Sequence, residues 1–440
     1  MNFKASILCF LIPVMSGAQN LKTWDLRECI EYALSHNLTI KQRETSKQVE
    51  EISLQTAKNS RLPGVSANAS ESFNFGRSLT SENTYISRNT QNTSMGINLS
   101  VPIFTGFQIP NQIALSRLNL QAAIADLEKA KEDMSIQVTS AYLQVLYTKE
   151  LKGVSQKELK ISQEQLYRLK VLLANGKISE VEVSEAHSRV AQDSLSMVQA
   201  INNYQLALLD LSQLLELSSP EGFSVAEPME VIPSSITGNP EEIYQQAIAL
   251  KPAVKAEELR LKGTEKNILL ARSGYYPTLS FGAGMNTGYY KTSGMDSSPF
   301  GRQLKDNWSQ NLGISLSIPI FNRFETRDAI RKAKVQRYSQ ELQLESVKKT
   351  LYKEIQQAYY NAVAARAKYQ SGKVAERAAT VSFELVSKKY ENGKATATEF
   401  NESKTKMERA IADCVQAKYD YLFRTKILAF YRGESLYASN

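Results

Sequence analysis

The sequence contains two copies of one pattern, and this internal repeat limits the folds open to the chain more than any other feature. The segment 100–104, SVPIF, recurs as SIPIF at 317–321. Asn175-Gly176-Lys177 recurs as Asn392-Gly393-Lys394 at the same offset, so no gap separates the two matches. The sequence therefore predicts a protomer built from two tandem structural repeats.

The repeats are predicted to cover residues 19–217 and 240–433, with a C-terminal tail at 434–440. The segment 218–239 carries several prolines and glycines, which favour turns and loops, and is predicted to link the copies.

Each copy contains a stretch in which apolar and small polar residues alternate, a period typical of strands with one apolar and one polar face. We expect β-hairpins at about 64–104 and about 278–321. Runs of roughly ten residues with this pattern also suit strands of a membrane barrel. Prolines at the ends of these stretches disfavour the helical conformation and are predicted to mark the strand–helix junctions: Pro63, Pro102, Pro277 and Pro319.

A long helical pattern follows each hairpin. The first runs from about 106 to 173, which corresponds to about 100 Å of helix. Its apolar residues recur at coiled-coil spacing, as do those of the second copy. Each long helix is expected to end at an Asn-Gly turn, with a tip near Gly176 or Gly393, and a second helix of about 35–40 residues should run back.

Four membrane-type strands cannot close a barrel within one chain, and a sheet in lipid can have no free edge. Two chains would form a narrow eight-stranded barrel, whereas three would form twelve strands around a lumen. The small polar faces favour an open, water-filled pore. The competing interpretation is a soluble protein in which two hairpins pack on a helical bundle.

The N-terminus has the pattern of a signal peptide. Lys4 precedes the apolar run 5–15, and Ser16-Gly17-Ala18 supplies small residues for cleavage after residue 18. The predicted leader, 1–18, contains one of the three cysteines. The other two, Cys29 and Cys414, either form a disulfide or stay as buried thiols.

Composition and motifs argue against several classes of protein. The 53 basic residues are interspersed with 45 acidic ones, so the net charge of +8 is typical of solvated helix surfaces and we expect no nucleic-acid partner. No zinc-protease, phosphate-loop or nucleophile-elbow motif is present, and His36 and His187 stand alone. We therefore expect no enzyme activity, no cofactor and no metal site.

With the two strand–Pro–(Ile/Val)–Phe–helix junctions and the two glycine turns, the chain resembles the TolC-like outer-membrane efflux proteins. That resemblance implies an α+β membrane protein, a homotrimer with a twelve-stranded β-barrel in outer-membrane lipid and a periplasmic α-helical tunnel. It also implies two partners, a periplasmic adaptor protein and an inner-membrane pump or secretion ATPase. The competing function is a non-conducting periplasmic coiled-coil scaffold, or an adhesion or assembly protein.

The resemblance further implies that the two helical tips meet the adaptor. The residues concerned are the turn glycines and the lysines that follow them: Gly176, Lys177, Gly393 and Lys394.

Acidic residues follow each tip at matching positions, six and nine residues after the turn glycine: Glu182, Glu185, Glu399 and Glu402. A spacing of three places each pair on one helix face. By resemblance, the second pair rings the periplasmic entrance and Tyr390 helps to hold it closed. Ala395 stands where the family has a basic residue, so the closing contacts should differ. The alternative is that these glutamates form an ordinary solvated helix face.

Overall fold

The computed structural model describes residues 22–79, 83–219, 222–227 and 238–436. The predicted signal peptide and part of the predicted linker lie outside these ranges. The chain divides into two compact units. The hairpin unit contains residues 1–41, 130–247 and 352–440, and the sheet unit contains residues 42–129 and 248–351. Both copies of the repeat contribute to each unit.

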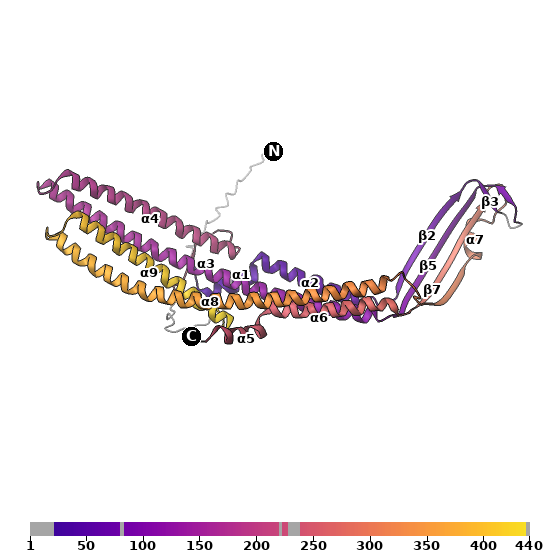
Figure 1. The fold of residues 1–440 in the computed structure, drawn as a ribbon. Coiled ribbons are helices and arrows are strands. Elements are labelled where there is room, and N and C mark those ends of the chain that lie inside the picture. Colours follow the sequence, from indigo (N-terminus) through magenta and orange to yellow (C-terminus); the bar gives the residue numbers. More distant parts are fainter. Residues whose placement is uncertain (1–21, 80–82, 220–221, 228–237, 437–440) are drawn as a thin grey trace, which may run out of the picture. The chain divides into compact units, whose positions relative to one another are not determined.

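The sheet unit contains an antiparallel sheet of four strands in the order β2-β5-β7-β8 (Figure 1). The strands are β2 (Gly64–Asn74), β5 (Thr90–Thr105), β7 (Thr278–Thr292) and β8 (Ser309–Ser317). Each repeat supplies two of them, and the central pairing of β5 with β7 joins the two repeats. The strand pattern predicted from the alternating residues is therefore confirmed.

Both edge strands of this sheet are uncovered in the single chain, since every residue of β2 and β8 is exposed. The two faces differ as predicted. One carries apolar side chains, among them Val65, Ile97, Met285, Leu312 and Ile314, all exposed. The other carries serine, asparagine and glycine. A large apolar surface of this kind needs a partner or a lipid environment.

The four junction prolines do not occupy equivalent positions. Pro63 and Pro277 directly precede β2 and β7, and Pro319 follows the end of β8 by two residues. Pro102 instead lies within β5, where it pairs with Ser280 immediately before a register shift at Phe104. Proline has no backbone N–H, and a bulge accommodates the lost ladder bond.

A short helix, α7 (Phe300–Asp306), fills the connection between β7 and β8 and was not predicted. The Gln303 side chain accepts a hydrogen bond from the Tyr290 N–H (3.0 Å) and donates one to its carbonyl (3.1 Å). The pairing of β7 with β8 ends at Asn286 and Ser309. Beyond that point, α7 bonds the β7 backbone at Tyr290 in place of a neighbouring strand. Two further short strands, β3 (Arg77–Leu79) and β4 (Tyr85–Ser87), pair with each other.

Two helical hairpins make up most of the hairpin unit, and their two long helices begin within the residues of the sheet unit. Helices α3 (Gln108–Ala174) and α8 (Glu325–Glu391) are each 67 residues long, and α4 (Glu180–Leu214) and α9 (Ala397–Tyr431) are each 35. Figure 1 shows α4 running back along α3, and α9 along α8. The equal lengths reflect the repeat. Many of the apolar residues at coiled-coil spacing are buried, including Met134, Val138, Val145, Ile355 and Ala362.

Shorter elements complete the fold: α1 (Leu26–His36), α2 (Leu38–Asn59), α5 (Pro240–Leu250) and α6 (Pro252–Arg272). Strand β1 (Lys22–Trp24) pairs in parallel with β6 (Phe223–Val225), so part of the predicted linker is a strand. The Tyr142 hydroxyl donates to the Ala226 carbonyl at 2.5 Å beside this pair.

Cys29 and Cys414 are both free and buried. Burial raises the pKa of each thiol to about 12, so both stay protonated at neutral pH. No described helix has both the length and the hydropathy needed to cross a bilayer.

Candidate functional site

The tips of the two hairpins have the same backbone geometry. Gly176 and Gly393 adopt φ of +67° and +69°, a left-handed conformation that glycine tolerates best. The N–H of Lys177 bonds to the Leu172 carbonyl (3.0 Å) in one turn, and that of Lys394 bonds to the Lys389 carbonyl (2.8 Å) in the other. These bonds end each helix in a Schellman motif. A Cβ atom on either glycine would meet nothing within 4 Å, so the turns are open to a partner.

Glu399 has a structural role at the start of α9. It forms a capping box with Thr396, whose N–H donates to the Glu399 carboxylate at 2.8 Å while the Glu399 N–H donates to the Thr396 hydroxyl at 3.2 Å. The hydrogen bonds from Thr396 lower the pKa of Glu399, which stays ionised at neutral pH. Glu402 lies one turn further on, exposed, 4.0 Å from Lys406.

The other predicted gate residues lie together. Glu182, Glu185 and Tyr390 line one small cavity between the two hairpins, with Gln165 and Arg189. Burial raises the pKa of Tyr390, the Glu182 carboxylate adds to the rise, and a hydrogen bond with Gln165 opposes it. Glu399 and Glu402 do not line this cavity. The structure thus brings first-copy glutamates to the second-copy tyrosine.

Aromatic contacts within the second hairpin and an ionic contact between the two hairpins lie beside this cavity. The Tyr390 ring stacks on Phe400 with centroids 5.0 Å apart, and Phe400 packs with Phe383 in a small apolar cluster. Arg168 of α3 donates to the Glu391 carbonyl at 3.0 Å and lies 3.6 Å from its carboxylate.

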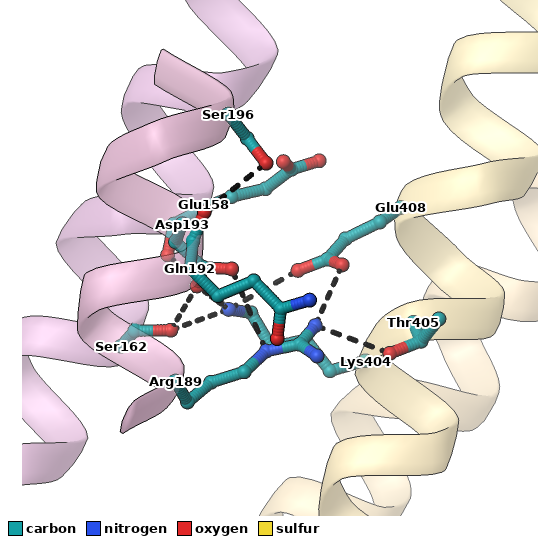
Figure 2. Close-up of polar contacts among 9 residues, drawn as sticks. All are labelled: Glu158, Ser162, Arg189, Gln192, Asp193, Ser196, Lys404, Thr405 and Glu408. Carbon is teal, nitrogen blue, oxygen red and sulfur yellow. Dashed lines mark hydrogen bonds and ion pairs between the residues drawn. The ribbon is translucent and has the colours of Figure 1, made fainter. Parts of the chain in front are cut away.

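A buried ion cluster lies deeper between the hairpins (Figure 2). The ammonium group of Lys404 on α9 is fully buried. It lies 2.6 Å from Asp193 on α4 and 3.1 Å from Glu408 on its own helix, and it donates to the Ser162 hydroxyl on α3 at 2.5 Å. Ser162 in turn donates to Asp193. One lysine thus ties α9 to both helices of the other hairpin.

Arg189 on α4 extends the cluster. Its guanidinium lies 3.1 Å from Glu408 and 3.5 Å from Asp193, and it donates to the Thr405 hydroxyl at 3.1 Å. The contacts with Glu408 and Thr405 cross from one hairpin to the other, whereas Asp193 lies on the same helix as Arg189. The cluster was not predicted from the sequence, although Lys404 lies on the same helix stripe as buried Phe400 and Met407, and a charge on such a stripe is a signal for a buried pair.

Glu158 on α3 adds a third carboxyl group near two cations. Burial is the main cause that raises its pKa to about 7, and the carboxylates of Glu408 and Asp193 raise it further, against the opposing effects of Lys404 and Arg189. A proton on Glu158 leaves two carboxylates facing two cations.

Glu158→Gln should therefore change how stability depends on pH. Between pH 4.5 and 7 the folded chain holds a proton at Glu158 that the unfolded chain releases, so wild-type stability falls as pH rises through this window. The amide cannot ionise. In urea unfolding followed by circular dichroism, the free energy of unfolding of the variant should be higher than that of wild type at pH 8. The two values should approach each other near pH 5. The exposed Glu164→Gln is the control, and parallel pH profiles for E158Q and wild type would refute this account.

No group of three or more His, Cys, Asp or Glu side chains suited to a metal ion occurs in the part of the chain that the structure describes. The cluster and the cavity are instead suited to holding helices together.

Comparison with known proteins identifies the family. Residues 29–216 and 243–433 match the family described as outer membrane efflux proteins. The chain belongs to this family. The resemblance inferred from the junctions and turns is confirmed, and so is the predicted location in the outer membrane.

Relatives in the efflux family are distant but cover most of the chain. The outer membrane efflux protein BepC of Brucella suis is 21% identical over 388 residues, 88% of this chain and 80% of BepC. TolC of Escherichia coli is 23% identical over 343 residues, 76% of this chain and 68% of TolC.

Solved structures share the fold. The Campylobacter jejuni CmeC outer membrane channel is 19% identical with a TM-score of 0.77, covering 94% of this chain and 87% of CmeC. A CusC structure is 15% identical with a TM-score of 0.78, and the match covers 93% of this chain and 92% of the CusC chain. The predicted fold class, two repeats with four strands and long paired helices, is that of these efflux-family channels.

Proposed function

We propose that this protein is the outer-membrane exit duct of a tripartite efflux or type I secretion system, working as a homotrimer. The observation that carries the proposal is the open four-stranded sheet, which has two uncovered edges and an exposed apolar face. Lipid cannot hydrogen-bond the free edges, so the sheet must close with copies of itself. Three copies give twelve strands around a water-filled lumen lined by the small polar face.

The paired helices of the hairpin unit then supply the periplasmic part of the duct. Its partners are a periplasmic adaptor protein and an inner-membrane pump or secretion ATPase. The open turns at Gly176-Lys177 and Gly393-Lys394 support a contact with the adaptor, because the glycines pack against nothing and a basic side chain follows each. Cross-linking from positions 177 and 394 should capture the adaptor, and capture from neither position would contradict this contact.

Acidic residues at the helical tips make the periplasmic entrance favourable for cations. In a trimer, Glu399 and Glu402 would place six carboxylates around the entrance, and such a ring raises the local cation concentration. Glu182 and Tyr390, which share a cavity, would hold the hairpins together beside it.

Replacing both second-copy glutamates by glutamine should reduce the potassium-to-chloride permeability ratio by about twofold or more. Glutamine at position 399 can keep the capping box, so the variant removes charge without removing the helix cap. The ratio is measured from reversal potentials in a salt gradient. Asp413→Asn, an exposed carboxylate further along α9, is the control. An unchanged ratio in the double variant would rule out the ring at these residues.

The exit-duct proposal itself is tested by ion conductance of the purified protein in a planar bilayer, where a duct conducts and a scaffold does not.

A further inference from the structure

Four asparagines lie at one level of the sheet, on its small polar face, with one on each strand: Asn68 on β2, Asn98 on β5, Asn286 on β7 and Asn311 on β8. The register places Asn68 and Asn286 on either side of Gly96, and Asn98 and Asn311 on either side of Gly284. Asparagine and glycine thus alternate across two adjacent rows of the sheet.

The amide groups occupy the space that the two glycines leave empty. A Cβ atom on Gly96 would lie 2.5 Å from the Asn286 Oδ1 and 3.3 Å from the Asn68 Oδ1. One on Gly284 would lie 2.6 Å from the Asn311 Oδ1. Both glycines are consequently buried in a sheet whose neighbouring residues are largely exposed. Any side chain at these two positions would displace an amide.

Hydrogen bonds link the amides in pairs. The Asn98 Nδ2 donates to the Asn68 Oδ1 at 2.9 Å, and the Asn286 Nδ2 donates to the Asn311 Oδ1 at 3.0 Å. Each pair uses one N–H and one oxygen, so most of its hydrogen-bonding capacity is left. Asn68, Asn98 and Asn311 are exposed, so this capacity faces away from the sheet.

The composition of this band is unfavourable for a strand. Asparagine and glycine are both depleted in strands, and glycine in a strand interior weakens it. Serine or threonine would provide a polar face with less loss of strand propensity. The four amides and two glycines together suggest that an uncharged group with both donors and acceptors is needed at this level.

We infer that Asn68, Asn98, Asn286 and Asn311 form an uncharged hydrogen-bonding band in the lumen of the barrel, which passing polar solutes of either charge contact. This inference rests on the proposed exit duct, in which the polar face lines the lumen and a trimer presents twelve amides. Because an amide donates and accepts, the band can replace water around carboxylate, phosphate, hydroxyl and ammonium groups alike. Discrimination by charge is then left to other parts of the duct.

Thiol labelling tests which face of the sheet lines the lumen. Asn98→Cys and Ile97→Cys place a thiol on opposite faces of β5, one residue apart. Cys29 and Cys414 are buried and serve as an internal background. A water-soluble, negatively charged methanethiosulfonate reagent should reduce the single-channel conductance of N98C by about half or more and leave that of I97C unchanged.

Introduced charge tests whether the band controls permeation. Asn98→Asp with Asn286→Asp adds six carboxylates to a trimer and should raise the potassium-to-chloride permeability ratio by about threefold or more. Asn92→Asp, on the same face of β5 but nearer the end of the strand, should have a smaller effect.

Block of I97C instead of N98C would overturn the assignment of the face. If the double variant N98D/N286D had the same potassium-to-chloride permeability ratio as wild type or as N92D, the role of the band would be overturned. Both results require a conducting wild type, so they are distinct from failure of the proposed duct, in which wild type itself does not conduct.

Discussion

Replacing Lys404 by methionine should destabilise the helical hairpins by about 3–5 kcal/mol, because it removes one partner of a buried ion pair and leaves the other charged in the interior. Methionine resembles the lysine stem in length, so little packing is lost. Asp193, less than a tenth exposed, would lose the cation 2.6 Å away, and Glu408 would lose one of its two partners. Among the described residues of the hairpin unit, only Lys404 is a charged residue with 0% of its surface exposed.

The measurement is urea unfolding of the detergent-solubilised protein, followed by helical circular dichroism at pH 7. Lys406→Met is the matched control, since Lys406 lies two residues further along α9 and its side chain is 78% exposed. Its effect should stay below about 0.5 kcal/mol. Adding Asp193→Asn to K404M should recover part of the loss, because it removes the buried carboxylate that has lost its nearer cation and keeps only Arg189 at 3.5 Å. Equal unfolding midpoints for K404M and K406M would show that the cluster does not hold the hairpins.

A charge on the apolar face of the sheet should prevent stable insertion in the membrane. Leu312 lies near the middle of β8, and its side chain is 78% exposed in the single chain. A lysine near the bilayer midplane of a membrane strand costs about 2–4 kcal/mol, and a trimer would carry three. Leu312→Lys should therefore reduce the amount of trimer recovered from outer membranes at least about tenfold.

Ser315→Lys is the control for this prediction. Ser315 lies three residues along the same strand and on the opposite, polar face, where the lysine would lie in a water-filled lumen. Its trimer should be recovered at close to the wild-type amount in membrane fractionation followed by electrophoresis without heating. Equal losses in L312K and S315K would contradict the assignment of one face to lipid and the other to water.

The sequence predicted the elements that have a long, regular period. The helices ending at Gly176 and Gly393 repeat an apolar seam over many turns, and the strands of the sheet alternate over nine or more residues. The three-residue strands β1 and β6 are too short to show a period of their own. They pair with each other although almost the whole first repeat lies between them in the sequence. Helix α7 is held by side-chain bonds from Gln303, which no local pattern reveals. These elements depend on tertiary contacts.

The candidate site was only partly predictable for the same reason. The turn glycines and the matched glutamates follow from the alignment of the two repeats. The capping role of Glu399 follows from Thr396 three residues before it, a capping-box spacing that the gate prediction did not include. The bonds of Lys404 to Ser162 and Asp193 join residues more than 200 positions apart. Only the packing of two hairpins brings them together.

The central claim is that three copies pair all their sheet edges to form one barrel whose lumen conducts ions. Single-channel recording of the purified trimer in a planar lipid bilayer tests this claim most directly. Addition of the protein should produce discrete current steps of uniform size, and L312K, which cannot insert stably, should produce none. The steps should survive S315K, although their size can change. A membrane-inserted trimer that never conducts, at any applied voltage and in any salt, would contradict the account and favour a non-conducting periplasmic scaffold.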